Sequence, residues 1–184
     1  MDKEPRPQSI DEALKWHAAI SESVIQHRAN VLSALRGGGS LPSTGSLIGL
    51  TESEIEAHFE AERAEVDGMC IVNIAAAAEA ALRRDYRERV RRNAADPLSQ
   101  AYCSYHKTLL GQKVWRPDFD QGGILDVLKD SNAVANHLVT AFRHVLRIRH
   151  WYAHGRHWLL RTNAIEELVA VYETCRALLD ALPG

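Results

Sequence analysis

The chain has 184 residues, of which 46% are hydrophobic and 25% are charged. These values are ordinary for one water-soluble domain with a real hydrophobic core. The 22 basic and 24 acidic side chains give a net charge of -2, so no global positive field points to a nucleic-acid partner. Any such partner must be held by a local patch of charge.

The three cysteines, Cys70, Cys103 and Cys175, are scattered, odd in number and embedded in apolar helical patterns. This usage is typical of buried reduced thiols in a cytosolic protein and argues against a disulfide scaffold. The first residues do not resemble a signal peptide, and the longest aliphatic stretch, residues 71–82, is too short to span a bilayer. We therefore expect a cytoplasmic protein without a membrane partner.

Residues 1–8 are polar and contain two prolines, which predicts a disordered lead, whereas residues 9–184 form the single domain. Ser9 and Glu12 have capping-box spacing and begin an amphipathic helix that ends at Gly37. Residues 37–49 are rich in glycine and predict a flexible loop. This loop is not a phosphate-binding loop, because it has neither the required lysine nor a preceding strand.

Thr51 and Glu54 form a second capping-box pattern, and the helical pattern runs on to Arg92, with or without a break near Asp67 and Gly68. The alanine-rich middle of this segment allows another helix to approach closely. Glu79 has two interpretations here. It either pairs with Arg83 on an exposed helix face or supports a functional site. The basic block at residues 83–92 is either a solvated helix face or a surface that contacts phosphates.

The second half of the chain also has helical periodicity. Asp96 followed by Pro97 predicts a helix start, with a stop at Gly111. Residues 112–123, which include Trp115, predict an irregular loop that covers part of the core. A short helix at 124–129, an apolar stripe at 134–152 and a last helix capped by Asn163 and Glu166 follow. Because no segment alternates with a period of two, we predict an all-α fold, a single bundle of five to six helices.

The stripe at 134–152 leads into a group of polar side chains at a helix end, where Arg149 and His154 precede Gly155. An imidazole can exchange a proton near pH 7, and a guanidinium can stabilise the negative charge of a five-coordinate phosphate. This pair therefore suits RNA cleavage by the 2′-OH without a metal. The structural alternative is that both side chains meet the carbonyl groups at the helix C-terminus.

The segment Leu146-Arg-Ile-Arg149-His150-Trp-Tyr-Ala-His154-Gly155 resembles the signature of the HEPN superfamily. That signature is an arginine, a polar residue, three more positions and a histidine, at the end of a late helix in a helical bundle. The resemblance covers residues 50–182 in topology and is specific in about ten residues. It implies an HEPN-like fold and a metal-independent endoribonuclease with a role as a toxin or in anti-phage defence.

The resemblance also implies roles for individual residues. Arg149 and His154 would be the catalytic pair, supported by His150 at the polar position and by Glu79 on an earlier helix. It further implies no cofactor, a homodimer in which both motifs face one cleft, and a possible cognate inhibitor or antitoxin. Family members that an adenylylating partner neutralises carry a tyrosine where this chain has Arg156. The basic side chains that we expect to bind RNA are Arg83, Arg87, Arg147 and Arg156.

Two other classes of function compete with a nuclease. His150, His154 and His157 have the spacing to approach one metal ion on a continuous helix, although Gly155 is expected to break that helix. The second alternative is a catalytically inactive helical module that binds nucleotides or another protein, as antitoxin and immunity subunits do. Such a module would use Trp151, Trp158 and the basic block for its contacts.

Overall fold

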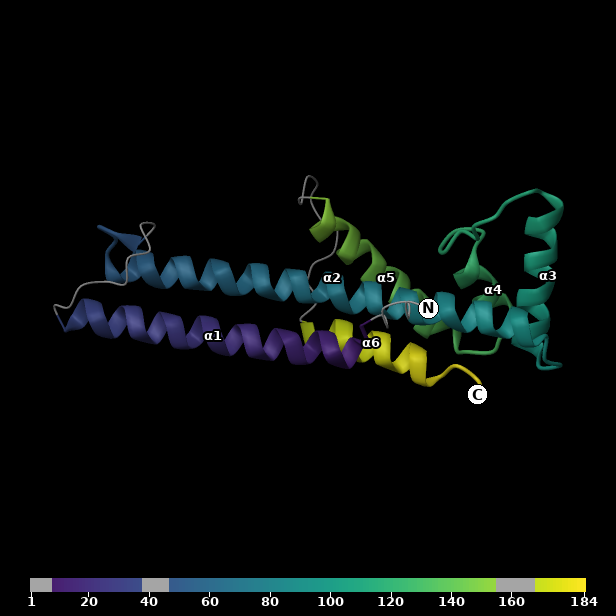
Figure 1. Ribbon diagram of the computed structural model, residues 1–184, viewed down its shortest axis with the longest axis horizontal. Coiled ribbons are helices and arrows are strands. Elements are labelled where there is room, and N and C mark those ends of the chain that lie inside the picture. Colours follow the sequence, from purple (N-terminus) through teal and green to yellow (C-terminus); the bar gives the residue numbers. More distant parts are fainter. Residues whose placement is uncertain (1–7, 38–46, 155–167) are drawn as a thin grey trace, which may run out of the picture.

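The computed structural model describes residues 8–37, 47–154 and 168–184, and these residues form α-helices and no strand. The predicted all-α bundle of five to six helices is thereby confirmed. The arrangement of the helices is shown in Figure 1. The described helices are α1 (Ile10–Arg36), α2 (Glu52–Arg92), α3 (Pro97–Gly111), α4 (Ile124–Asp130), α5 (Asn136–Ala153) and α6 (Leu168–Asp180).

Local capping interactions set the starts of the first three helices. Ser9 and Thr51 each form a complete capping box, in which the hydroxyl accepts from the backbone N–H three residues on and the glutamate there accepts in return. The Asp96 carboxylate accepts from the backbone N–H of Ser99 at 3.0 Å, with Pro97 in the first turn of α3. The predicted helix starts are therefore confirmed. The predicted cap of the last helix, Asn163 with Glu166, lies outside the described residues.

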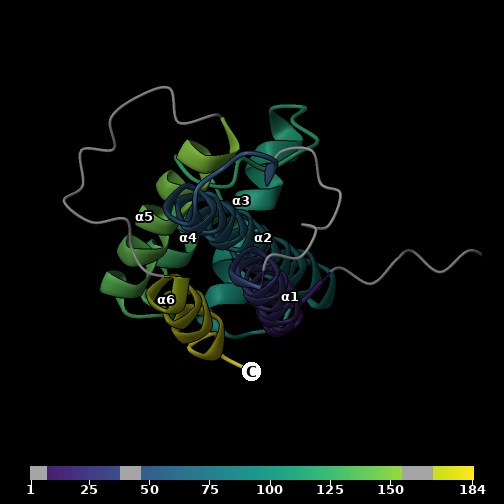
Figure 2. The same cartoon turned by 90° about the vertical axis from the view of Figure 1, so that its left-hand side faces the viewer.

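Helix α2 is the axis of the fold. It runs without a break for 41 residues, so Gly68 lies within the helix and is buried. Helix α1 runs antiparallel to α2. Helices α5 and α6 pack against the middle and the second half of α2, and α3 crosses the end of α2 (Figures 1 and 2). The small side chains of Ala75, Ala77 and Ala78 are buried there, which lets the neighbouring helices approach closely.

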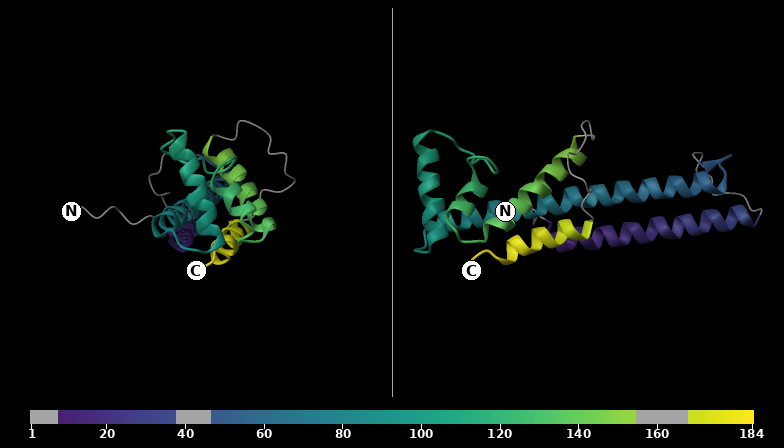
Figure 3. Two further views of the ribbon diagram at one scale, coloured as in Figure 1. Left: turned by 90° about the vertical axis from the view of Figure 1, so that its right-hand side faces the viewer. Right: turned by 180° about the vertical axis from the view of Figure 1, so that it is seen from behind.

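The described residues contain two hydrophobic clusters. The larger cluster draws on all six helices and includes Leu82, Tyr102 and Phe142. The smaller cluster lies where α1 ends and α2 begins, in a two-helix arm that extends away from the other four helices (Figure 3). Leu47, in the segment predicted to be a flexible loop, is buried in this smaller cluster. The C-terminal end of that loop is therefore part of the packed structure, and residues 38–46 lie outside the described residues.

The segment between α3 and α4 covers the core only in part. Phe119 is buried, whereas Trp115 is 84% exposed. Arg143 of α5 forms one ion pair with Asp120 of this segment at 2.7 Å and another with Asp126 of α4 at 2.6 Å, which anchors the segment beside the start of α4. The expected covering of the core thus comes from the second half of the segment, and its first half projects into solvent.

The described residues also bear on two expectations from the sequence, one about membrane-spanning helices and one about the three cysteines. No helix among them is long and apolar enough to cross a membrane. Cys70, Cys103 and Cys175 are buried free thiols, as predicted. Burial raises the pKa of Cys70 to about 11 and that of Cys175 to about 12, so both thiols are protonated and unreactive near neutral pH.

Arg89 in the basic block is a buried structural residue. Its guanidinium pairs with Asp85 at 2.9 Å and with Asp96 at 3.2 Å, and it also donates to the backbone carbonyl of Pro183. It therefore joins the end of α2 to the start of α3 and to the C-terminal segment. This part of the basic block is used inside the fold and is not a free phosphate-binding surface.

Replacing Arg89 by methionine should lower the free energy of unfolding by about 2–3 kcal/mol, because two carboxylates and a carbonyl lose a buried partner. Urea denaturation measures this change. The matched control is Arg91→Met, two residues later on the opposite face of α2, since Arg91 is exposed and its pair with Glu88 is screened by water. That variant should unfold at the wild-type midpoint. Equal loss of stability in both variants would contradict the structural role of Arg89.

Candidate active site

Helix α5 ends at the predicted catalytic pair, Arg149 and His154. Ala153 is its last residue, and the backbone N–H of His154 donates to the carbonyl groups of His150 and Tyr152. The side chain of His154 is exposed, whereas Arg149 lies five residues earlier and is half-buried. The helix therefore presents an imidazole at its end and a guanidinium closer to α2. This exposed position of His154 also suits an interaction with the negative end of the helix dipole.

Arg149 is held by Glu79, which lies 70 residues earlier in the chain. The Arg149 Nη1 donates to Glu79 Oε2 at 2.5 Å. Arg83 donates from Nε to Glu79 Oε1 at 2.9 Å, and its Nη2 lies 2.8 Å from the same oxygen in an ion pair. The side chain of Glu79 is only 17% exposed. Glu79 therefore forms the predicted i, i+4 pair with Arg83, although on a largely buried face and not on an exposed one, and it also contacts the candidate catalytic arginine.

The electrostatic balance of this cluster favours an anion. Two guanidinium groups share one carboxylate, so the cluster of Arg149, Arg83 and Glu79 keeps a net positive charge. A guanidinium has five N–H donors, and within the described chain Arg149 uses only Nη1 for a side-chain hydrogen bond. Its side chain is about one-third exposed, which leaves donors available to an incoming phosphate.

His150 and His154 lie one helical turn apart with their rings close together. The ring centroids are 4.1 Å apart and the ring planes are inclined by 57°. The structure therefore brings the expected supporting residue His150 against the candidate catalytic imidazole of His154. Such contact limits the orientations that the His154 ring can adopt.

The residues expected to bind RNA fall into different environments. Arg87 and Arg147 are exposed, on α2 and α5. Arg83 is half-buried, because its guanidinium lies 4.8 Å from the centre of the Phe119 ring and also donates to the Pro117 carbonyl at 3.4 Å. Arg156 lies outside the described residues. Arg87 and Arg147 are thus placed to meet an anion in solvent, whereas Arg83 is fixed in position beside Glu79.

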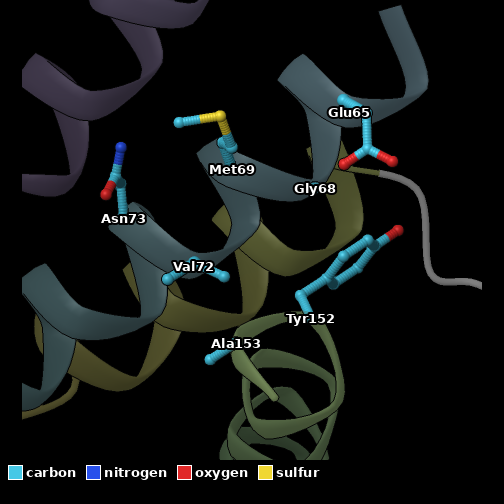
Figure 4. A pocket seen from close by; sticks show the side chains of 7 residues that line it. All are labelled: Glu65, Gly68, Met69, Val72, Asn73, Tyr152 and Ala153. Carbon is cyan, nitrogen blue, oxygen red and sulfur yellow. The ribbon is translucent and has the colours of Figure 1, made fainter. Parts of the chain in front are cut away.

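An open pocket of about 240 Å³ lies beside the end of α5 (Figure 4). At this pocket the close approach of α2 and α5 depends on Gly68 of α2, since a Cβ atom there would lie 2.5 Å from Cε1 of Tyr152 of α5. A glycine within a long helical pattern was the only sequence signal of this contact. The pocket is lined by Glu65, Gly68, Met69, Val72 and Asn73 of α2 and by Tyr152 and Ala153 of α5.

The three-histidine metal site is not supported by the described part of the chain. His157, the third member of the predicted set, lies outside it. Among the residues that the structure describes, no group of three or more histidine, cysteine, aspartate or glutamate side chains could hold a metal ion.

A second polar cluster joins α1 to α2 but does not form a catalytic triad. The same ring nitrogen of His17, Nε2, lies 2.6 Å from Asp67 Oδ1 and 3.2 Å from Ser21 Oγ. A triad requires the carboxylate and the nucleophile to use opposite nitrogens of the imidazole. This cluster therefore fixes the packing of the two helices and does not activate Ser21.

The contact between Glu79 and Arg149 predicts energetic coupling between α2 and α5. In a double-mutant cycle with Glu79→Gln and Arg149→Met, we expect a coupling energy of about 1–3 kcal/mol in the free energy of unfolding. The exposed pair of Arg176 and Asp180 on α6 is the control, and it should show no measurable coupling. Additive effects at Glu79 and Arg149 would show that the pair does not join the helices.

The close contact at Gly68 predicts that the effect of Gly68→Ala on the free energy of unfolding changes sign when the Tyr152 ring is removed. Alanine is the better helix former by about 1 kcal/mol, but in the wild-type background Gly68→Ala should be destabilising because its Cβ atom meets the Tyr152 ring. In a Tyr152→Ala background the same substitution should be stabilising by about 1 kcal/mol. Thermal unfolding of the four proteins measures both effects. A stabilising effect in both backgrounds would contradict the close contact.

Comparisons with protein-family models, with curated proteins and with solved structures found no match to this chain. Function is therefore inferred from the side chains themselves and from how the helices place them.

Proposed function

We propose that this protein is a metal-independent endoribonuclease of the HEPN type. The observation that carries the proposal is the position of Arg149, which Glu79 holds beside the end of α5 where His154 is exposed. The order of the residues resembles the HEPN signature, and the acidic residue expected on an earlier helix is in contact with the arginine. The net positive charge of this cluster suits a phosphodiester substrate.

In the proposed reaction the 2′-OH of RNA attacks the adjacent phosphorus atom, and the bond from phosphorus to the 5′ oxygen breaks. The imidazole of His154 accepts the proton of the 2′-OH, and Arg149 stabilises the negative charge of the five-coordinate phosphate. The 5′ oxygen leaves as a hydroxyl after taking up a proton. The products are a 2′,3′-cyclic phosphate and a 5′-hydroxyl, and no metal ion or cofactor takes part.

A second copy of the chain would complete this site. The leaving oxygen needs a proton at the same time as the 2′-OH loses one, so a neutral and a protonated imidazole act best together. Two protomers that pair at the ends of their α5 helices would supply two His154 side chains to one cleft. Glu79 and Arg83 act as positioning residues in this scheme, and His150 restrains the ring of His154.

Cleavage of RNA in the presence of a chelator tests the proposed activity. Arg149→Ala and His154→Ala should each lower the cleavage rate by about 10²- to 10⁴-fold, because each removes a group that acts in the transition state. The wild-type rate should not change with chelator. The controls are His137→Ala, at the exposed start of α5, and Arg176→Ala on α6. If the wild type and all variants behave alike, the proposed nuclease function is wrong.

Sedimentation at micromolar concentration tests the shared cleft. We expect a dimer for the wild type and for both active-site variants, since Arg149 and His154 would serve catalysis more than association. A protein that remains monomeric and still cleaves RNA would contradict the proposed dimer but not the proposed cleavage reaction.

A further inference from the structure

Trp115 is the most exposed large hydrophobic side chain among the described residues, at 84%. A tryptophan offers an unusually large apolar surface, and leaving it in water forgoes the free energy of burying it. Leu110 and Val114 beside it are also exposed. This part of the chain therefore has a surface that the fold itself does not use.

The backbone on both sides of Trp115 is fixed. The N–H of Val114 donates to the Leu109 carbonyl at 2.9 Å, and Lys113 takes the left-handed conformation that ends α3, with a φ of 57°. On the other side the Pro117 carbonyl accepts from Arg83, and Phe119 is buried. The indole therefore projects from a short segment, residues 113–116, whose backbone is anchored on both sides. We call this segment the ridge.

Two exposed cations lie within two residues of Trp115 in the sequence, one on each side of it. Lys113 and Arg116 are both exposed, and within the described residues neither forms an ion pair with the chain. One exposed carboxylate, Asp118, follows them. An exposed aromatic side chain with a cation before it and a cation after it in the chain matches a nucleic-acid strand, in which bases alternate with negatively charged phosphates. A protein partner of mainly apolar character would not need the two cations.

This ridge is connected to the candidate active site through Arg83. Pro117 accepts from Arg83, which pairs with Glu79, which holds Arg149. Two residues of extended chain span at most about 7 Å, so the backbone of Trp115 lies within about that distance of Pro117. The ridge therefore lies where an RNA strand bound at Arg149 could continue.

We propose that residues 113–116 form a stacking platform for single-stranded RNA. An unpaired base of the strand stacks on the Trp115 indole, and the adjacent phosphates lie against Lys113 and Arg116. This inference rests on the proposed nuclease function and adds to it the class of substrate, an unpaired strand. The platform recognises the base by its face and so selects for unpaired bases more than for a particular sequence.

Binding of a fluorescein-labelled 2′-O-methyl oligouridylate, followed by anisotropy, tests the platform without cleavage, because the probe lacks the attacking 2′-OH. Trp115→Ala should weaken binding about tenfold, and Trp115→Phe should retain most of it. Lys113→Ala with Arg116→Ala should lower the slope of log K against log salt by about 1.4, the value for two lost phosphate contacts on a single strand. Ile48→Ala is the control, since Ile48 is also exposed but lies in the arm.

The outcomes separate the platform from the nuclease. Equal binding by the wild type and Trp115→Ala overturns the platform, and leaves that surface to a protein partner, whereas loss of cleavage in Arg149→Ala would still support the nuclease. Binding that depends on Trp115 without any cleavage of unmodified RNA supports the platform and overturns the nuclease. Thermal unfolding of Trp115→Ala should match the wild type, because the side chain makes little contact with the fold.

Discussion

The carboxylate of Glu79 joins parts of the chain that are far apart in sequence. Its Oε2 accepts from Arg149 at the end of α5, and its Oε1 accepts from Arg83, which also reaches the carbonyl of Pro117. A largely buried carboxylate is stable in this position only because two guanidinium groups replace its water. The positions of the α5 end, of α2 and of the segment before α4 consequently depend on one another. The proposed catalysis and the proposed stacking platform both rely on this arrangement.

The packing around α2 explains why the candidate site lies where it does. Small residues along this helix, such as Ala75 and Ala78, let α5 and α6 approach its second half, and Gly68 gives room for the ring of Tyr152. The end of α5 is thus pressed against α2, with Arg149 directed to Glu79 and His154 left in solvent. The arm formed by the end of α1 and the first part of α2 extends away from this region (Figure 3). This arm is joined to the site through the continuity of α2.

Much of the fold could be predicted from local patterns, and part of the site could as well. The capping residues Ser9 and Thr51 begin their helices as expected, because a cap is satisfied by atoms three residues away. Glu79 was a candidate because of its i, i+4 spacing from Arg83 and because the resemblance implies an acidic residue on an earlier helix. The roles of Arg89 and Trp115 were not predicted. An arginine in a basic block has the same local sequence whether it is buried or exposed, and a tryptophan in a loop is more often covered than presented.

The sequence by itself determined the helical class, the helix starts and the kinds of chemical group near residue 150, since these follow from caps, periodicity and side-chain chemistry within a few residues. Only the tertiary structure decided which charges pair. With 22 basic and 24 acidic side chains, the sequence allows many pairings across long separations. The choice of Glu79 for Arg149, 70 residues apart, is made by the close packing of α2 against α5. Electrostatic attraction weakens with distance and is screened by water, so a pair becomes specific only after hydrophobic burial has brought its helices together.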